Sequence, residues 1–199
     1  MNPAWQLKGM SRPTPPACKT GNRPADTSAL RHRVWRRSHI GIDGQTPEIR
    51  AAGLTTRDVG DAPVLPGLPD RIPPGQDIAS LTADGAFDTR RCHGAIAARG
   101  APAIIPPRKN ARPRKPDTAG AIARNEAPRA SRRFGRTIWR QWSGCHRRSR
   151  AEPKMHCGKL PGQRLMARDS DRQVSGFQVR VAVLNRFTAP GIPVTETAG

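Results

Sequence analysis

The chain contains no tyrosine, and its few cysteines exclude two familiar classes of small protein. Four cysteines are spread over 199 residues without a Cys-x-x-Cys pair, so neither a disulfide framework nor a redox motif is indicated. No apolar run reaches about 18 residues, so we expect no membrane span. The first residues lack the apolar core of a signal peptide. We therefore expect a cytoplasmic protein in a reducing compartment.

Acidic residues are also scarce, and this shortage sets the charge of the chain. Only 15 Asp and Glu stand against 35 Lys and Arg, which gives a formal net charge of +20. Such a balance favours nucleic acid or another anionic surface as partner. The 21 prolines and 19 glycines approach a composition at which disorder competes with folding. A decayed reading frame that folds poorly is therefore one interpretation, although periodic segments argue for a folded domain.

The first periodic segment begins at Arg33. A β-rich run ends at Ile42, Asp43-Gly44 supplies a turn signal, and a second run covers residues 48–54. This order predicts a β-hairpin. Apolar residues with the spacing of one helix face follow, but prolines interrupt them, so we expect a short or kinked helix. These apolar residues are Val64, Leu65, Leu68 and Ile72.

Residues 76–105 predict a strand, a helix and a second, parallel strand. The first strand covers residues 78–83 and the second covers residues 101–105. The helix is capped by Asp88, begins at Thr89 and ends before a C′ glycine. Its inward face and this glycine are Cys92, Ala95, Ile96 and Gly100. Such a unit has a right-handed crossover. Asp84 then follows the first strand at the edge where open α/β sheets build sites, although a turn aspartate explains it equally well.

Residues 106–132 are rich in Pro, Arg and Lys and predict a basic loop or insertion. Beyond this stretch, aromatic residues alternate with arginines, including Arg147 and Arg148. Arginines in such a pattern bind phosphates, while the rings either stack on bases or enter a core. The aromatic residues are Phe134, Trp139 and Trp142.

The stretch "CHRRSRAEPKMHCGK" places one carboxylate, Glu152, among cations. On a continuous α-helix, Cys145, Arg148, Glu152 and Lys159 share one stripe. A zinc site is an alternative, but neighbouring Cys-His pairs point to different sides of a helix. A solvated basic tail is another alternative. The residues of the zinc alternative are Cys145, His146, His156 and Cys157.

Three segments together carry a resemblance to a known family. They are "SHIGIDGQTPEIRA", "IASLTADGAFDTRRCHGAIAARGAPAIIPPRKNARP" and "CHRRSRAEPKMHCGKLPGQRLMARD". From about residue 31 onward the chain resembles the C-terminal two-thirds of a bacterial insertion-sequence transposase of the DDE class, in the insertion-sequence-five group. The resemblance implies an α/β, RNase H-like mixed sheet flanked by helices, in which two aspartates and one glutamate hold Mg²⁺ or Mn²⁺. It also implies transposon-end and target DNA as partners, and a homo-oligomer in the transposition complex.

The resemblance assigns roles to particular residues. The family's second acid lies in a T-A-D-G-A motif and corresponds to Asp84, and its third corresponds to Glu152. These two are the expected catalytic and metal-holding residues. Arg148 and Lys159 match cations of the family's helical signature, and with Arg147 they are the expected phosphate contacts.

The departures from the family pattern predict an inactive, N-terminally truncated copy. Residues 1–30 do not resemble the strand that carries the first catalytic aspartate, so we expect them to be disordered and the sheet to be incomplete, with the hairpin beside the Asp84 strand. Neither Asp26 nor Asp43 is a convincing replacement. Cys145 stands in place of a signature tyrosine, and Pro153 is expected to cost about 3 kcal/mol inside a helix. The predicted catalytic domain covers residues 31–190, followed by a tail at 191–199.

Two alternatives keep other functions open. One is a non-catalytic basic protein that binds nucleic acid without metal dependence. The other is an enzyme whose missing strand is supplied by a separately encoded piece.

Overall fold

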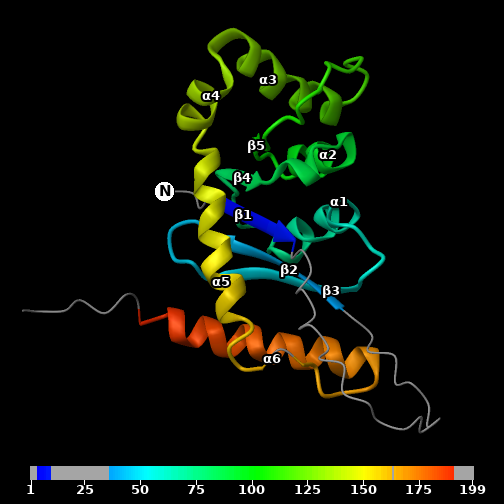
Figure 1. Cartoon of the computed structure of the whole chain (residues 1–199), viewed down its shortest axis with the longest axis vertical. Coiled ribbons are helices and arrows are strands. Elements are labelled where there is room, and N and C mark those ends of the chain that lie inside the picture. Colours follow the sequence, from blue (N-terminus) through cyan, green and yellow to red (C-terminus); the bar gives the residue numbers. More distant parts are fainter. Residues whose placement is uncertain (1–3, 10–35, 163, 191–199) are drawn as a thin grey trace, which may run out of the picture.

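A computed structural model describes residues 4–9, 36–162 and 164–190 of the chain. They form one five-stranded sheet with helices on both faces (Figure 1). None of the described helices is long and apolar enough to cross a membrane. The strands are β1 (Ala4–Gly9), β2 (Arg36–Asp43), β3 (Ile49–Thr56), β4 (Ser80–Ala83) and β5 (Ala103–Ile104). The α-helices are α1 (Asp61–Val64), α2 (Arg90–Ala98), α3 (Ala119–Phe134), α4 (Arg136–Trp142), α5 (Ala151–Cys157) and α6 (Ser170–Thr188). The 3₁₀ helices are η1 (Leu65–Gly67), η2 (Pro69–Arg71), η3 (Gly85–Phe87) and η4 (Cys145–Arg150).

The opening strand β1 lies at the centre of the sheet. The strand order is β3-β2-β1-β4-β5, and β1 is antiparallel to β2 but parallel to β4. Two predictions were therefore wrong: the first strand is present, and the hairpin is separated from the Asp84 strand by β1. The prediction of disorder is wrong for residues 4–9, and residues 10–30 lie outside the described part of the chain, as does the tail at 191–199.

The hairpin and the strand-helix-strand unit are confirmed. Strands β2 and β3 pair antiparallel, with a bulge between Gly41 and Ile42. Strands β4 and β5 pair parallel, and α2 connects them. The N-cap of α2 is Thr89 rather than Asp88, because the Thr89 side chain accepts the Cys92 N–H at 3.1 Å. Gly100 follows the helix with a φ of 67°, the conformation that a C′ glycine adopts.

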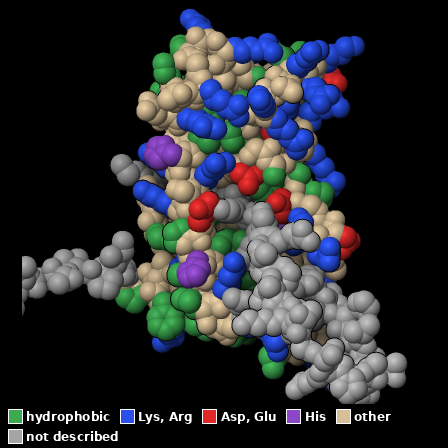
Figure 2. All heavy atoms as spheres, viewed as in Figure 1, with side chains coloured by type: hydrophobic (Ala, Val, Ile, Leu, Met, Phe, Trp, Pro, Cys, Tyr) green, Lys and Arg blue, Asp and Glu red, His purple; other side chains and the backbone are tan. Residues whose placement is uncertain are grey.

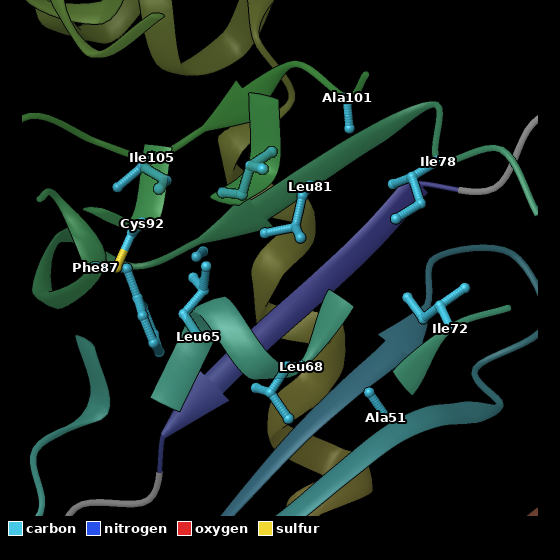
Figure 3. Packing of buried hydrophobic residues seen from close by; sticks show 12 residues of the cluster. Ala51, Leu65, Leu68, Ile72, Ile78, Leu81, Phe87, Cys92, Ala101 and Ile105 are labelled. Carbon is cyan, nitrogen blue, oxygen red and sulfur yellow. The ribbon is translucent and has the colours of Figure 1, made fainter. Parts of the chain in front are cut away.

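Each face of the sheet has its own core. On one face, Leu81 of β4 packs with Leu65, Leu68, Phe87 and Cys92 (Figure 3). The interruption by prolines has the predicted effect, because α1 is only one turn long and 3₁₀ helices follow it. The other core joins apolar residues of β2, β3, α5 and α6. Its members are Ile40, Ile42, Ile49, Ala52, Ala151, Met155 and Val181.

The basic insertion predicted at residues 106–132 is only partly a loop. Helix α3 begins at Ala119, where the Thr118 hydroxyl accepts the Ala121 N–H at 3.2 Å, and it ends at Phe134, with Gly135 as its C-cap. Pro128 lies inside this helix and is buried. A second helix, α4, follows directly, and α3 and α4 lie at the end of the molecule away from α6 (Figure 1).

Candidate functional site

Asp84 is the first residue after β4, at the carboxyl end of a strand beside the central strand. It is the N-cap of η3, and its Oδ1 accepts the Ala86 N–H at 2.8 Å. This bond uses one carboxylate oxygen and fixes the side chain in the turn. The residue is half-buried, so its other oxygen can reach solvent or a ligand.

Arg108 lies against the same turn and was not among the predicted site residues. Its Nε and Nη2 donate to the carbonyl oxygens of Gly85 and Ala86, each at 3.4 Å. The segments after β4 and β5 meet here, because a Cβ on Gly85 would lie 3.3 Å from the Pro106 carbonyl oxygen. The signal was available in the sequence: Arg108 follows the second strand of a parallel pair, and the carboxyl ends of such strands meet at one edge.

A buried ion pair between Asp88 and Arg124 stabilises the segments next to this edge. Arg124 of α3 binds Asp88 with both arms of its guanidinium, Nε at 2.8 Å from Oδ1 and Nη2 at 3.0 Å from Oδ2. The Arg108 N–H donates to Asp88 at 3.3 Å, and His93 Nε2 lies 3.5 Å away. Burial by itself raises the pKa of Asp88, but the nearby His93, the Arg108 N–H and Arg124 outweigh it and lower that pKa. Asp88 thus connects α2, α3 and the segment after β5.

The predicted stripe on one continuous helix is wrong. Residues 145–150 form the 3₁₀ helix η4, and the α-helix α5 begins only at Ala151. A 3₁₀ helix turns about 120° per residue instead of about 100°, so Cys145 leaves the stripe that an α-helix would give. Cys145 is buried, whereas Arg147, Arg148 and Glu152 are exposed. Lys159 lies in the turn beyond α5 and is half-buried.

Pro153 does not carry the penalty expected from the sequence. It is the third residue of α5, and the N–H groups of a first turn have no partner inside an α-helix. Proline is tolerated there, so the cost of about 3 kcal/mol for a helix interior does not apply. The proline instead coincides with the change from 3₁₀ to α geometry.

Helix geometry directs Glu152 toward the Asp84 end of the sheet. Arg150 donates to the Gly44 carbonyl oxygen in the β2–β3 turn, and Lys154 contacts Thr188 of α6. Both cations lie on one flank of the helix, four residues apart. Ala151 and Met155 face the sheet. Glu152 is about 200° around the helix from Arg150, which places it on the opposite flank.

The strand directions determine which end of the sheet this opposite flank faces, because β2 is antiparallel to β1 and β4. The β2–β3 turn lies at the amino ends of β1 and β4, and Trp5 of β1 is in register with both Asp43 and Leu81. Asp84 follows the carboxyl end of β4, at the other edge. The flank that carries Glu152 therefore faces this other edge. The 3₁₀ helix η4, which precedes α5, contacts both β1 and β4.

No acid on β1 completes this pair. The strand reads AWQLKG, without aspartate or glutamate. Asp43 is at the wrong edge, and its Oδ1 already accepts the Gln45 N–H at 2.7 Å and the Thr46 N–H at 3.3 Å. Asp26 lies outside the described residues.

Among the residues that the structure describes, no three His, Cys, Asp or Glu side chains are grouped so that they can hold a metal ion. The zinc alternative therefore has no support in this part of the chain, and Cys145 packs with Ala127 and Trp139 instead. Asp84 and Glu152 are two acids and do not amount to the three-acid set that the resemblance implies. The described residues thus do not fit a complete divalent-metal site.

The comparison with known families agrees with the family that the quoted motifs indicate. No solved structure matches the chain. The family model of the transposase DDE domain matches residues 10–186, which include Asp84, Glu152 and the described elements after β1 except the last two residues of α6. The chain therefore belongs to the transposase DDE domain family.

Proposed function

We propose that this chain is a DNA-binding member of the DDE transposases that neither cuts nor joins DNA. The observation that carries this proposal is the sequence of β1: the central strand, next to the Asp84 strand, contains no acid. The family implies an RNase H-like fold with the first catalytic aspartate on the opening strand. A mixed sheet with its opening strand at the centre and helices on both faces supports such a fold. The quoted motifs further support the insertion-sequence-five group.

Asp84 and Glu152 are the two acids that the proposal retains from the family site. The turn after β4 holds Asp84, and the flank of α5 that faces the same edge carries Glu152. We predict that their carboxylates lie within roughly 8 Å of each other, the separation that two metal ions about 4 Å apart require. With the third acid absent, we assign no reaction step to a bound metal.

DNA is the partner because the charge and the family agree. The excess of Lys and Arg over acids gives a net charge of +20. Near the site, Arg108 lies at the Asp84 turn, and Arg147 and Arg148 are exposed on η4. We propose these three and Lys159 as phosphate contacts. Guanidinium groups suit this role because they hold phosphate oxygens with two parallel hydrogen bonds.

A salt titration tests the binding. We expect the purified chain to shift an arbitrary duplex, with an affinity that falls steeply between about 50 and 200 mM salt because bound phosphates release counterions. The double variant Arg147→Ala, Arg148→Ala should reduce the slope of log affinity against log salt. An affinity that does not change with salt contradicts the proposal.

A cleavage assay tests the missing acid. We expect no nicking or joining of supercoiled plasmid above background with Mg²⁺ or Mn²⁺. Cleavage by the wild-type chain that Glu152→Gln abolishes would show that another residue supplies the first acid.

Variants that restore an acid to β1 extend the cleavage assay. Gln6 and Lys8 of β1 are in register with Ile42 and Ile40, whose side chains pack beneath α5 and α6. Gln6→Asp and Lys8→Asp therefore each introduce an acid on the central strand, at a position paired with one of these isoleucines. Nicking by either variant that is lost on adding Glu152→Gln would support the assignment of the other two acids. Lys8→Ala is the matched control, since it removes the cation without adding an acid.

A further inference from the structure

Two tryptophans three residues apart in α4 have opposite environments. Trp139 is 4% exposed and packs with Ala127 and Cys145, whereas Trp142 is 79% exposed. Ile138, four residues before Trp142, is 58% exposed and is its neighbour on the same helix face. The core at this end of the molecule thus uses one indole ring and leaves the other in solvent.

Phe134, at the end of α3, adds a third large apolar side chain to this region. It is 50% exposed, and the Arg133 guanidinium lies 5.3 Å from the centre of its ring. Exposed apolar residues are common when they occur singly. All three lie within residues 134–142, at the end of α3 and in α4, and exposed apolar side chains that gather in one region mark binding surfaces.

The same region is strongly cationic. Lys and Arg side chains gather over α3 and the loop before it (Figure 2). Residues 119–150 contain nine arginines and a single acid, Glu126. Only Arg124 among these nine is buried.

Three of these arginines act through their charges on the Cys145 thiol. Burial raises the pKa of this thiol, and Arg148, Arg140 and Arg136 oppose the increase through their charges. All three therefore act on one buried atom beside Trp139. We use the name α3–α4 surface for the exposed residues Arg133, Phe134, Arg136, Ile138, Arg140 and Trp142.

We propose that the α3–α4 surface binds an unpaired stretch of a DNA strand, with a base stacked on Trp142 and the phosphates held by the arginines around it. This proposal rests on the proposed DNA-binding function and adds a second contact, outside the Asp84 edge. An exposed indole face accepts any base whose own face is uncovered, and stacking of this kind is tolerant of sequence. Bases inside a duplex already stack on their neighbours, so the ring distinguishes unpaired from paired DNA.

The positive charge of the α3–α4 surface favours nucleic acid over an apolar protein as its partner. A protein that covered Trp142 and Ile138 with apolar side chains would bring exposed arginines against a surface without compensating charge. A DNA strand supplies phosphates and flat apolar faces together, and this is the combination that the surface offers.

Fluorescence anisotropy on the full chain tests the proposal. The probes are a fluorescein-labelled oligothymidine of about 20 nucleotides and a duplex of the same length. We expect Trp142→Ala to weaken binding to the single strand at least about fivefold, because one lost stacking contact has about that effect. The affinity for the duplex should stay within about twofold. Trp142→Phe, which keeps an aromatic face, should recover most of the loss.

The control is Phe187→Ala on α6. Phe187 is also 79% exposed, but it lies on the helix at the opposite end of the molecule from α3 and α4 (Figure 1). We expect this variant to bind both probes like the wild type. Trp142 is so exposed that its replacement should leave the fold intact, and the unchanged duplex affinity verifies this.

The possible failures are distinguishable. Equal weakening of both probes by Trp142→Ala, or no effect on either, overturns the stacking proposal alone. A wild-type chain that binds the duplex but not the single strand also overturns it and leaves the proposed function standing. A wild-type chain that binds neither probe overturns both.

Discussion

The crossing of α2 and α3 gives a sharp test of the packing at this end of the molecule. Gly120 lies in the first turn of α3, and a Cβ on it would be 2.4 Å from the Arg90 carbonyl oxygen and 2.8 Å from the Gly94 nitrogen. Both atoms belong to the α2 backbone, so Gly120→Ala forces the helices apart. Overpacking of this kind costs about 1–3 kcal/mol, and the better helix propensity of alanine offsets at most about 1 kcal/mol. Because the clashing atoms are backbone, the upper part of that range applies, and we expect a net loss of about 1–2 kcal/mol.

The measurement is a thermal melt followed by far-ultraviolet circular dichroism. For a chain of this size the expected loss lowers Tm by about 2–8 °C. Gly94→Ala is the matched control, because a Cβ there meets nothing closer than the Gly120 Cα at 3.8 Å. That variant should keep or raise Tm. If the two alanine variants have the same Tm, the close approach of α2 and α3 is wrong.

Three further predictions concern single side chains. The folded-state pKa of Asp88 is lowered from 3.8, so the stability that Asp88 contributes is present above pH 3.8 and is lost as the pH falls through the folded-state pKa. Urea melts at a series of pH values should show this loss in the wild type and a flatter pH profile in Asp88→Asn. Thr89→Ala removes the side-chain cap of α2 and should cost about 1 kcal/mol in the same melts, whereas Thr89→Ser should cost little; equal losses would exclude a capping role. Burial raises the pKa of Cys145, so iodoacetamide should modify it more slowly than the half-buried Cys157 in the native chain, and mass spectrometry of the peptides would reveal any reversal of this order.

The local elements were predictable because their signals are local. The turn Asp43-Gly44 lies between two β-rich runs, and the hairpin forms there. Asp84 and Gly100 mark the ends of the first strand and the helix in the parallel unit, and both positions hold in the structure. In each case neighbouring residues alone determine the element.

Strand β1 was missed because its partners are distant. Its six residues lie in an aperiodic stretch, and the strand forms only through pairing with β2 and β4. Helix α3 was missed for another reason: the stretch is rich in Arg and contains Pro128, so composition suggested a loop. Its limits, Thr118 and Gly135, are ordinary helix-start and helix-end residues and were available signals.

The candidate site shows which site residues can be placed from the spacing of residues in the sequence and which cannot. The position of Asp84 followed from the strand pattern alone. The stripe through Glu152 assumed 3.6 residues per turn from Cys145 to Lys159, and the 3₁₀ geometry of η4 breaks that assumption. The direction of Glu152 required contacts of Arg150 and Lys154 with distant segments, which no spacing rule contains.

The central position of β1 has a consequence for how the chain folds. This strand is synthesised before the other four described strands, but one of its neighbours, β4, is synthesised only after the whole hairpin. Until then β1 and the hairpin expose a strand edge that attracts other chains. Pairings between such distant segments also form slowly. We therefore expect refolding to be limited by the docking of β4 onto β1, and aggregation during refolding to increase when β1 is deleted.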